Sequence, residues 1–557
     1  MKKTGILKTA TVALLAGFFA VFLLLPIYTV VEEGLRWSLI CEVFRNPLYL
    51  EGLLNSFLLA AVTTCLVFLI SFPLALIYDR LDFPGKGICN LAMMLPMILP
   101  PFVGALGFQQ ILGHYGVVNT ILTDLGFARI DFLGGSGRFW SICVIEALHL
   151  YPILYLNLVT SLGNIDPAMT EAAKNLGAGR WYRLRRITIP LLKPGILAGG
   201  SIVLIWSFTE LGTPLMFGYT RTTAVQVFNG ITELETNPLP YTLVVVMLIL
   251  ALGMYLVSRL ALSAGGANSA VKGHASSSAR PARGVRKVLA PLAFLAVTLV
   301  AVSPHIALIL TAVSRNWYGT ILPEHLTFLH FDNALSHKIV LPSIVNSLKY
   351  SSLAMIFALA VGILLSLIVV RWRFRGAAIL DILAMTPLAV PGIVIAFGYL
   401  GMSVKYAWAH EMFNPVDNPL LLLAAAYAIR RLPYVVRSVT AGLEQTPEEL
   451  EFAARNLGAD AFQTLRRVTL PLITANIVVG GLFAFSFSML EVSDSLILAQ
   501  KAEFFPITRA IFELSMILGS GPVTACAFGV WTMAFMAATL GAAGILLGRK
   551  IGAIFRL

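Results

Sequence analysis

The chain has 557 residues, of which 58% are hydrophobic and only 12% are charged, and its mean hydropathy is +0.84. Soluble domains carry about 25% charged residues, so this composition excludes a soluble globular protein and indicates one that crosses a membrane many times. The net charge of +12 would suggest nucleic acid as a partner in a soluble chain. In a membrane protein the positive-inside rule is the better account, and no nucleic-acid partner is expected.

Apolar windows of about 20 residues predict the membrane spans. There are twelve, in two groups of six: 9–31, 53–78, 88–112, 139–162, 193–212 and 240–262, then 288–313, 347–370, 378–402, 419–442, 477–497 and 521–546. The first follows Lys2, Lys3 and Lys8 and has no A-x-A cleavage site. It is too long for a signal peptide, so we interpret it as an uncleaved span. The expected fold is all-α and polytopic.

The charged loops predict the orientation of the chain. A linker rich in Gly, Ser and Ala, at 263–287, separates the two groups, and its charged residues are all basic. The loop 213–238, on the opposite side of the membrane by count, has Arg221 against Glu233 and Glu235. The positive-inside rule therefore places the linker and both termini in the cytoplasm.

The two groups of spans are repeats of one another. "NSFLLAAVTTCLVFLISFPLALI" begins at Asn55 and "NSLKYSSLAMIFALAVGILLSLI" at Asn346, 291 positions later. The prolines of "LPMILPP" (Pro96) and "TPLAVPG" (Pro387) keep that offset. Six spans are an even number, so both repeats have the same orientation and are parallel repeats. We divide the chain into a first repeat at 1–262, the linker, and a second repeat at 288–557, and expect a substrate pathway between the halves.

A polar segment lies between the fourth and fifth spans of each repeat, near 166–194 and 446–475. Both copies predict a short amphipathic helix with a face of small residues, because apolar residues recur at i, i+3, i+4 and i+7: Met169, Ala172, Ala173 and Leu176, and Leu450, Ala453, Ala454 and Leu457. Gly177 and Gly458 are predicted to end these helices. The segments could lie on anionic headgroups or dock a cytoplasmic partner. Repetition at matched positions favours docking, since a partner with two-fold symmetry needs two binding sites.

The same segments carry a motif: E-A-A, three residues, G, nine residues, then I-x-L-P. This pattern resembles the signature of the inner-membrane permease subunits of binding-protein-dependent ABC importers. The first copy matches at Glu171, Ala172, Ala173 and Gly177, and the second at Ala453, Ala454 and Gly458. The second copy has Phe452 where the signature has Glu, and Glu451 stands one position early.

This resemblance implies a transmembrane domain of the type I ABC importer fold in a bacterial inner membrane. The two segments would be coupling helices that contact two copies of a cytoplasmic ATPase, and a periplasmic binding protein would deliver the solute. The chain has no GxxxxGK[ST] phosphate loop, so the partner ATPase would bind ATP and Mg, and neither enzymatic activity nor a cofactor is expected in this chain. The fused twelve-span layout resembles ferric-iron permeases; related fused permeases import thiamine or organophosphonates.

Ionisable residues at membrane depth are candidates for the substrate pathway. Glu210 lies about 15 residues past the start of its span, or roughly 22 Å in, and Glu491 occupies the matched place with Asp494 beyond it. Two carboxylates facing a shared axis could receive Fe³⁺, which favours oxygen ligands. Alternatively, Arg430 and Arg431 could neutralise these acids as structural pairs, or bind an anion such as a phosphonate. The sign of the substrate's charge stays open.

The remaining features give weaker predictions. Pro96 and Pro387 are expected to break the third span of each half, as a hinge or pathway lining or as a packed kink. His325, His330 and His337 are interpreted as solvated loop residues, and no metal site is expected. Functions of other classes are an ion-coupled secondary transporter, which also uses repeats and midplane sites, and a membrane scaffold.

Overall fold

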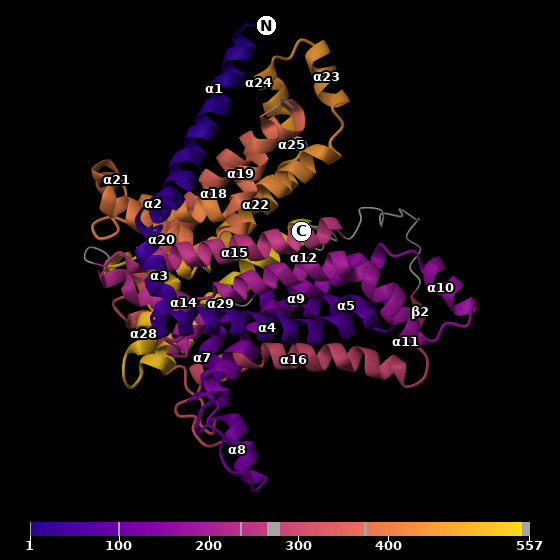
Figure 1. Ribbon diagram of the computed structural model, residues 1–557, viewed down its shortest axis with the longest axis vertical. Helices are drawn as coiled ribbons and strands as arrows, with labels where there is room; N and C mark the ends of the chain where they lie inside the picture. The colour runs from indigo at the N-terminus through magenta and orange to yellow at the C-terminus, as the bar shows by residue number, and fades with distance from the viewer. Residues whose placement is uncertain (1, 99–100, 234–236, 265–278, 373–375, 548–557) are drawn as a thin grey trace.

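The structure is a computed structural model that describes residues 2–98, 101–233, 237–264, 279–372 and 376–547. These residues are almost wholly helical (Figure 1). Two short strands, β1 (Leu81–Asp82) and β2 (Arg280–Pro281), pair in parallel with Leu81 opposite Arg280. The end of the predicted linker is therefore attached to the loop that follows the second span, while 265–278 lie outside the described residues.

The helices of the first half cover its six predicted spans and the loops between them. They are α1 (Lys2–Phe19), α2 (Leu25–Gly34), α3 (Trp37–Arg45), α4 (Pro47–Arg80), α5 (Lys86–Ala92), α6 (Leu95–Ile98), α7 (Pro101–Leu112), α8 (Val117–Asp124), α9 (Gly137–Gly163), α10 (Pro167–Asn175), α11 (Arg180–Arg183), α12 (Ile189–Phe208), α13 (Gly212–Met216), α14 (Thr223–Asn229) and α15 (Leu239–Ala264). Helix starts follow local rules: Asn46 caps α4 and Asp166 caps α10, each with proline at the next position.

The second half repeats this order. Its helices are α16 (Arg286–Ala312), α17 (Leu329–Ser336), α18 (Val340–Leu367), α19 (Ala377–Ala389), α20 (Gly392–Lys405), α21 (Ala407–Met412), α22 (Leu420–Gln445), α23 (Glu449–Asn456), α24 (Ala461–Thr464), α25 (Leu470–Leu472), α26 (Thr474–Met489), α27 (Ser493–Leu498), α28 (Ile507–Met516) and α29 (Gly521–Leu547). Matched π-helical turns, η2 (Leu184–Thr188) and η6 (Leu465–Thr469), lead into the fifth span of each half. A further π turn, η5 (Ile368–Trp372), ends the second span of the second half.

The described helices agree with a polytopic membrane protein. Among them, eight are long and apolar enough to cross a membrane, or up to eleven if each of three bent helix pairs is one span. The bent pairs include the third span of both halves and the fifth span of the second half. α22 is not among these candidates, because it carries Arg430, Arg431 and Arg437. A helix or bent pair lies at each of the twelve predicted places, and the predicted all-α fold is confirmed.

The first helix of each half packs on the other half. α2 lies against α20 of the second half, and α16 lies against α7 of the first, as Figure 1 shows for the indigo and salmon helices. Matched glycines make both contacts close: a Cβ on Gly107 would lie 1.7 Å from the carbonyl oxygen of Pro304, and one on Gly398 would lie 2.5 Å from that of Pro26. Gly107 and Gly398 are 291 positions apart, so the exchange is reciprocal.

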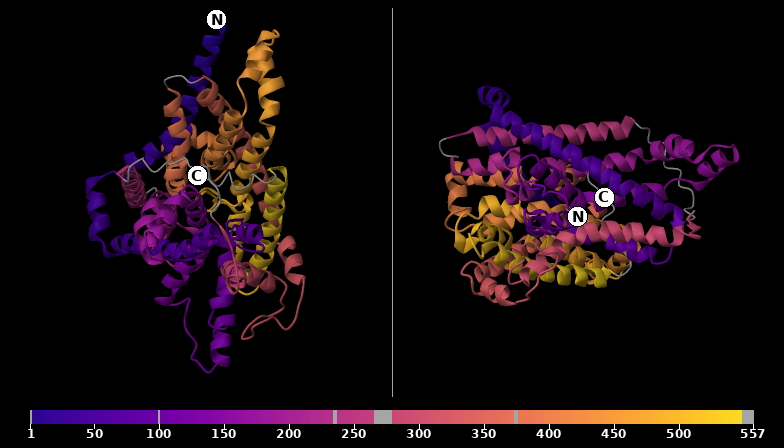
Figure 2. Two further views of the ribbon diagram at one scale, coloured as in Figure 1. Left: turned by 90° about the vertical axis from the view of Figure 1, so that its right-hand side faces the viewer. Right: turned by 90° about the horizontal axis from the view of Figure 1, so that it is seen from below.

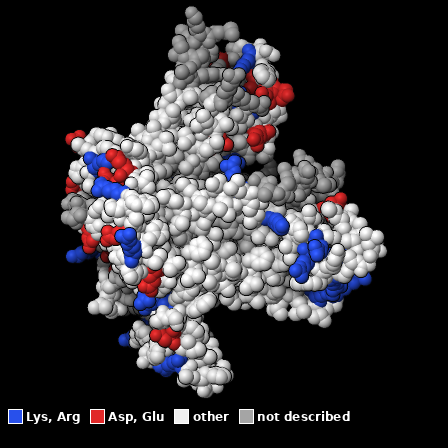
Figure 3. Space-filling model, viewed as in Figure 1, with Lys and Arg blue, Asp and Glu red and all other residues white. Residues whose placement is uncertain are grey.

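The long helices α4, α9 and α12 of the first half run across the view of Figure 1, whereas α18 and α22 of the second half rise steeply from them. Figure 2 (left) shows α1, in indigo, rising with the orange helices of the second half. Charged residues gather at the ends of the helices, over α10 and α11, over α23 and α24, and around α3 and α21, while most of the middle of the visible face is uncharged (Figure 3). An uncharged middle between charged ends is the pattern expected of a protein that faces lipid around its girth.

Candidate functional site

A cluster of buried charges lies where the fifth span of the second half is interrupted. α26 ends at Met489 and α27 begins at Ser493, so Glu491 stands in the break between them. Arg430 and Arg431, on α22, each form an ion pair with one oxygen of Glu491. Asp494 lies 3.5 Å from Arg430. The structure therefore contains the arginine–carboxylate pairing that the sequence left open.

The charged side chains of this cluster are largely buried, which makes their pairing important for stability. The side chains of Glu491 and Asp494 are 4% and 0% exposed, and those of Arg430 and Arg431 are 20% and 12% exposed. A buried charge without a partner is strongly destabilising, so each acid here depends on its arginine. The break in the third span packs directly against Arg430. A Cβ on Gly392, the first residue of α20, would lie 2.4 Å from the Cζ of Arg430.

Glu210 stands at the matched break of the first half. α12 ends at Phe208 and α13 begins at Gly212, so Glu210 lies just beyond the helix rather than within a continuous span as predicted. Gly212 and Pro214 follow Glu210 and are a local sign of this break, which a window averaged over about 20 residues does not detect. One carboxylate oxygen of Glu210 accepts a hydrogen bond from the backbone nitrogen of Thr213 at 3.2 Å. Within the described chain, no lysine, arginine or histidine lies within 4.0 Å of this carboxylate.

The two breaks touch each other. A Cβ on Gly212 would lie 3.2 Å from both the Oε1 of Glu210 and the Cγ1 of Val492, which belongs to the other half. Glu210, Glu491 and Asp494 therefore gather with Arg430 and Arg431 around the contact between the halves. Ion pairs and the contact between the two breaks thus bring together five of the seven residues predicted for the substrate pathway.

The first half has no arginine at the matched positions. His149 and Leu150 stand 281 positions before Arg430 and Arg431. The Nδ1 of His149 lies 2.7 Å from the carbonyl oxygen of Pro96, so the fourth span contacts the broken third span in this half too. Glu146 is buried and accepts a hydrogen bond from the hydroxyl of Ser207.

Pro96 and Pro387 both lie next to a break in the third span. Pro96 is in α6, before a 95° bend, and Pro387 is in α19, which ends at Ala389 before a 103° bend. The pathway and hinge roles of these prolines remain predictions, because a packed kink would have the same geometry.

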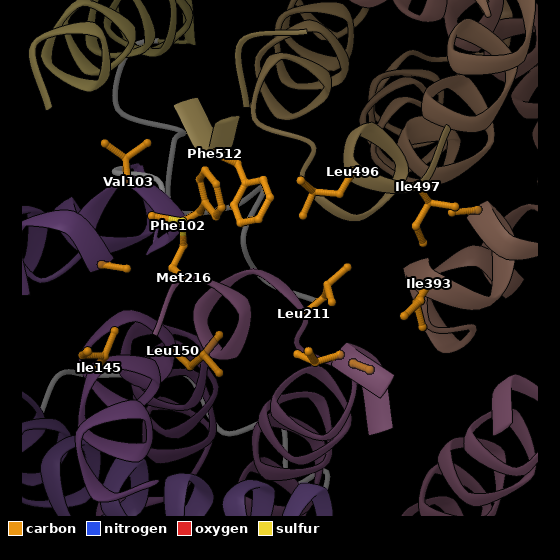
Figure 4. Packing of buried hydrophobic residues seen from close by; sticks show 14 of the residues in the cluster. Phe102, Val103, Ile145, Leu150, Leu211, Met216, Ile393, Leu496, Ile497 and Phe512 are labelled. Carbon is orange, nitrogen blue, oxygen red and sulfur yellow. The ribbon is translucent and has the colours of Figure 1, made fainter. Parts of the chain in front are cut away.

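Apolar side chains from both halves surround the cluster. Figure 4 shows Leu211 beside the first break, with Leu496 and Ile497 of α27 and Ile393 of α20 across from it. Phe102 of the first half lies 6.4 Å, between ring centroids, from Phe512 of the second (Figure 4). These residues are buried and belong to one apolar core that both halves share.

The two predicted coupling segments are short exposed helices, α10 and α23. Each ends in the glycine motif that the sequence predicts, with Gly177 at φ 84° and Gly458 at φ 92°. The backbone nitrogens three residues past the helix ends, of Ala178 and Ala459, donate to the carbonyl oxygens of Ala173 and Ala454 at 2.9 and 3.1 Å, which is the Schellman pattern. Glu171, Ala172 and Ala453 are exposed, while Ala173 and Ala454 are half-buried.

The signature acids of the two segments point in different directions. Glu171 is exposed and lies 3.9 Å from Arg280 of the linker. Glu451, by contrast, is 8% exposed and forms an ion pair with Arg371 at 2.9 Å. The sequence interpretation did not single out Arg371. Its signal was available, because Arg80 and Arg371 end the second spans at the repeat offset of 291.

A family model decides what this architecture is. The model described as "binding-protein-dependent transport system inner membrane component" matches the chain twice, at residues 54–263 and 358–547. The chain belongs to this family. It is a multi-pass inner-membrane permease of an ABC importer with two permease repeats, which confirms the resemblance drawn from the coupling segments. The secondary-transporter and scaffold interpretations are excluded by this membership. The exact repeat boundaries remain predictions.

Individual relatives of this permease carry different names. The chain is 27% identical over 472 residues to the putative ferric transport system permease protein FbpB 1 of Haemophilus influenzae, covering 82% of this chain and 70% of that protein. It is 24% identical over 487 residues to the probable ABC transporter permease protein y4fN of Sinorhizobium fredii, covering 83% of each. It is 31% identical over 216 residues to a probable molybdenum ABC transporter permease of Haloferax volcanii, covering 39% of this chain and 76% of that protein.

Proposed function

We propose that this permease imports ferric iron, which a periplasmic binding protein delivers and which two copies of a cytoplasmic ATPase drive across the membrane. ATP and Mg are bound by the ATPase, and this chain catalyses no reaction and holds no cofactor. Both termini and the linker face the cytoplasm, on the side of α10 and α23. The iron passes between the halves, close to Glu210.

The surfaces of α10 and α23 support docking of the ATPase. Each helix presents a highly exposed leucine at its end, Leu176 at 88% and Leu457 at 90% exposure, and a large aromatic follows it, Trp181 or Phe462. Exposed apolar residues on a polar segment outside the membrane are characteristic of a protein contact. Since the two surfaces are matched between the repeats, they fit a partner that is itself a dimer.

The observation that carries the ferric-iron proposal is the environment of Glu210. The cluster contains three carboxylates against two guanidinium groups, and both guanidinium groups are paired with Glu491. The carboxylate of Glu210 accepts a backbone hydrogen bond from Thr213 at 3.2 Å and forms no ion pair within 4.0 Å among the described residues. An acid without a cationic partner in an apolar setting attracts a hard cation, and a single such ligand lets the cation leave again. The name of the Haemophilus relative agrees with this substrate.

An oxyanion is the rival substrate. Arg430 and Arg431 could bind one if Glu491 released them, because guanidinium groups bind oxyanions in bidentate fashion. The name of the Haloferax relative favours this alternative over its matched region. A phosphonate fits the same chemistry, whereas thiamine, a cation, would depend on the acids.

Uptake into proteoliposomes separates these substrates. The vesicles contain the permease with its ATPase, and the binding protein encoded beside it is supplied outside. We expect radiolabelled ferric iron to enter in an ATP-dependent manner, and Glu210→Gln to lower the rate about tenfold or more at unchanged protein content. Uptake of molybdate or a phosphonate but not of iron, with normal transport by the Glu210→Gln variant, would overturn the ferric-iron proposal.

A further inference from the structure

The second coupling segment is held by a buried ion pair. Arg371 lies in η5, at the end of the second span, and its Nε donates to the Oε1 of Glu451 at 2.9 Å. The two side chains are only 9% and 10% exposed. The hydroxyl of Thr469, in the π turn η6, donates to the same carboxylate oxygen at 3.1 Å. One carboxylate on α23 is thus tied to the second span and to the entrance of the fifth.

Arg371 also reaches the end of α22. Its Nη2 donates to the carbonyl oxygens of Leu443 and Thr446, at 3.1 and 3.0 Å, and its Nη1 lies 3.8 Å from Glu448. A planar guanidinium with several donors in fixed directions holds its partners in one arrangement. Four segments therefore meet at this side chain: η5, the end of α22, the start of α23 and, through Glu451, η6. We call Arg371, Glu451 and Thr469 the joint.

The first half has no such joint. At the matched positions stand Arg80, Thr170 and Thr188, so threonine replaces the acid. Arg80 donates to the hydroxyl of Thr188 at 3.3 Å, and Thr170 bonds to the carbonyl oxygen of Pro167 within its own helix. The acid of this segment, Glu171, is 63% exposed and lies 3.9 Å from Arg280, which is 68% exposed. Such a surface pair holds a helix weakly.

The joint explains the departure of the second copy from the signature. Successive residues of a helix point about 100° apart, so moving the acid from position 452 to Glu451 turns it from the exposed face to the buried face. Phe452 then takes the exposed place, with 55% of its surface accessible. The acid of the second segment faces its own permease half.

The joint is connected to the charged cluster by one helix. Thr446, which follows the last residue of α22, accepts from Arg371, and Arg430 on the same helix pairs with Glu491. Pro433 lies within α22 between Arg430 and Thr446. A displacement of α23 can therefore reach Arg430 by movement of the whole helix or by a change of its bend at this proline.

We propose that Arg371, Glu451 and Thr469 are positioning residues that transmit ATPase movement from α23 through α22 to the Arg430–Glu491 pair. The second coupling segment, α23, is then firmly attached to its half of the transporter, whereas the first, α10, is attached weakly and can move relative to its half. This proposal rests on the proposed docking of the ATPase at α10 and α23.

The test compares matched substitutions in the two halves, in proteoliposomes that contain the permease, its ATPase and the binding protein. The readout is the amount of radiolabelled ferric iron taken up per ATP hydrolysed, together with the amount of ATPase that co-purifies. We expect Arg371→Gln to lower uptake per ATP about fivefold or more with unchanged co-purification. Arg80→Gln, at the matched position, should change it less than about twofold.

A milder pair covers the case in which Arg371→Gln fails to reach the membrane. Thr469→Val removes one hydrogen bond from Glu451 and should lower uptake per ATP about twofold or more, while the matched Thr188→Val should leave it unchanged. Equal effects in the two halves, or a normal ratio in both Arg371→Gln and Thr469→Val, would overturn the joint. If no ATPase co-purifies with the unaltered permease, the proposed function fails instead, before the joint is tested.

Discussion

Glu210 and Glu491 occupy the same break in the fifth span of the two halves, but only Glu491 is paired with arginine. The repeat thus places two acids symmetrically and then neutralises one of them. Because the two breaks are in contact beside Val492, the unpaired acid lies next to a neutralised one, and the two should respond differently to the same substitution.

The two glutamates are predicted to differ in stability as well as in transport. Glu491→Gln removes the buried partner of Arg431 and leaves Arg430 with Asp494, which lies 3.5 Å away. Breaking such a buried pair costs about 3–5 kcal/mol, so thermal unfolding of the purified permease should shift to lower temperature. Glu210→Gln breaks no ion pair and should leave the unfolding midpoint nearly unchanged while lowering iron uptake. Scanning fluorimetry in detergent checks the first expectation. Equal midpoints for the two variants would show that the arginine pairing carries little free energy.

The exchanged first helices should depend on Gly107 and Gly398. An alanine at either place would put its Cβ within 2.5 Å of a proline carbonyl oxygen on the other half. Backbone cannot move aside as a side chain does, so we expect each substitution to cost about 1–3 kcal/mol and to reduce the yield of folded permease. Gly200→Ala is the control, since its Cβ meets nothing within 4 Å. Normal yield and unfolding midpoint for both variants would contradict the close contact.

The coupling helices should need glycine at their ends. Gly177 and Gly458 have positive φ, where a residue with a side chain costs about 1–2 kcal/mol, and valine fits that region poorly. We expect Gly177→Val and Gly458→Val to reduce the ATPase that co-purifies with the permease, at unchanged membrane content. Gly179→Ala is the matched control, because Gly179 has a φ of −64°. Full co-purification with the double variant would argue that these helices are not the docking sites.

The aromatic contact between α14 and α28 should hold the halves together. Phe228 meets Phe512 edge to face at 6.4 Å between centroids, and Arg509 lies 5.9 and 5.5 Å from these two rings. A double-mutant cycle with Phe228→Leu and Phe512→Leu should give a coupling free energy of about 0.5–1.5 kcal/mol, measured by denaturant unfolding in detergent. Replacing Phe228→Leu by Phe68→Leu on α4 should reduce the coupling to zero. A coupling free energy of zero in both cycles would show that this contact does not stabilise the interface between the halves.

Sequence patterns predicted the features that local chemistry determines. Apolar length predicts the spans, and the small-residue periodicity followed by Gly177 or Gly458 predicts the coupling helices with their ends. The breaks at Glu210 and Glu491 were not predicted, although Gly212 and Pro214 follow Glu210 and Ser493 and Asp494 follow Glu491. Apolar windows of about 20 residues average over such short stretches and hide them.

Contacts between distant segments were beyond the same reasoning. The pairing of Arg430 with Glu491 was one of several open possibilities, because its distance depends on how α22 and α26 pack. The joint was missed for a different reason: Arg371 looked like one more basic residue of a cytoplasmic loop. Comparing it with Arg80 would have singled out the acid at Glu451 as the difference between the halves.

The reciprocal position of α2 and α16 has a consequence for the ancestry of the chain. A single repeat would leave the surface around Gly107 or Gly398 exposed, although its first helix would keep a neighbour, since α2 also packs on α15 and α16 also packs on α29. Each repeat thus offers the other a matched surface for its first helix, which is the arrangement expected if a half of this kind paired with a second copy of itself before duplication and fusion. Joining the halves in one chain leaves matched positions free to differ, and one half carries arginines where the other has His149 and Leu150.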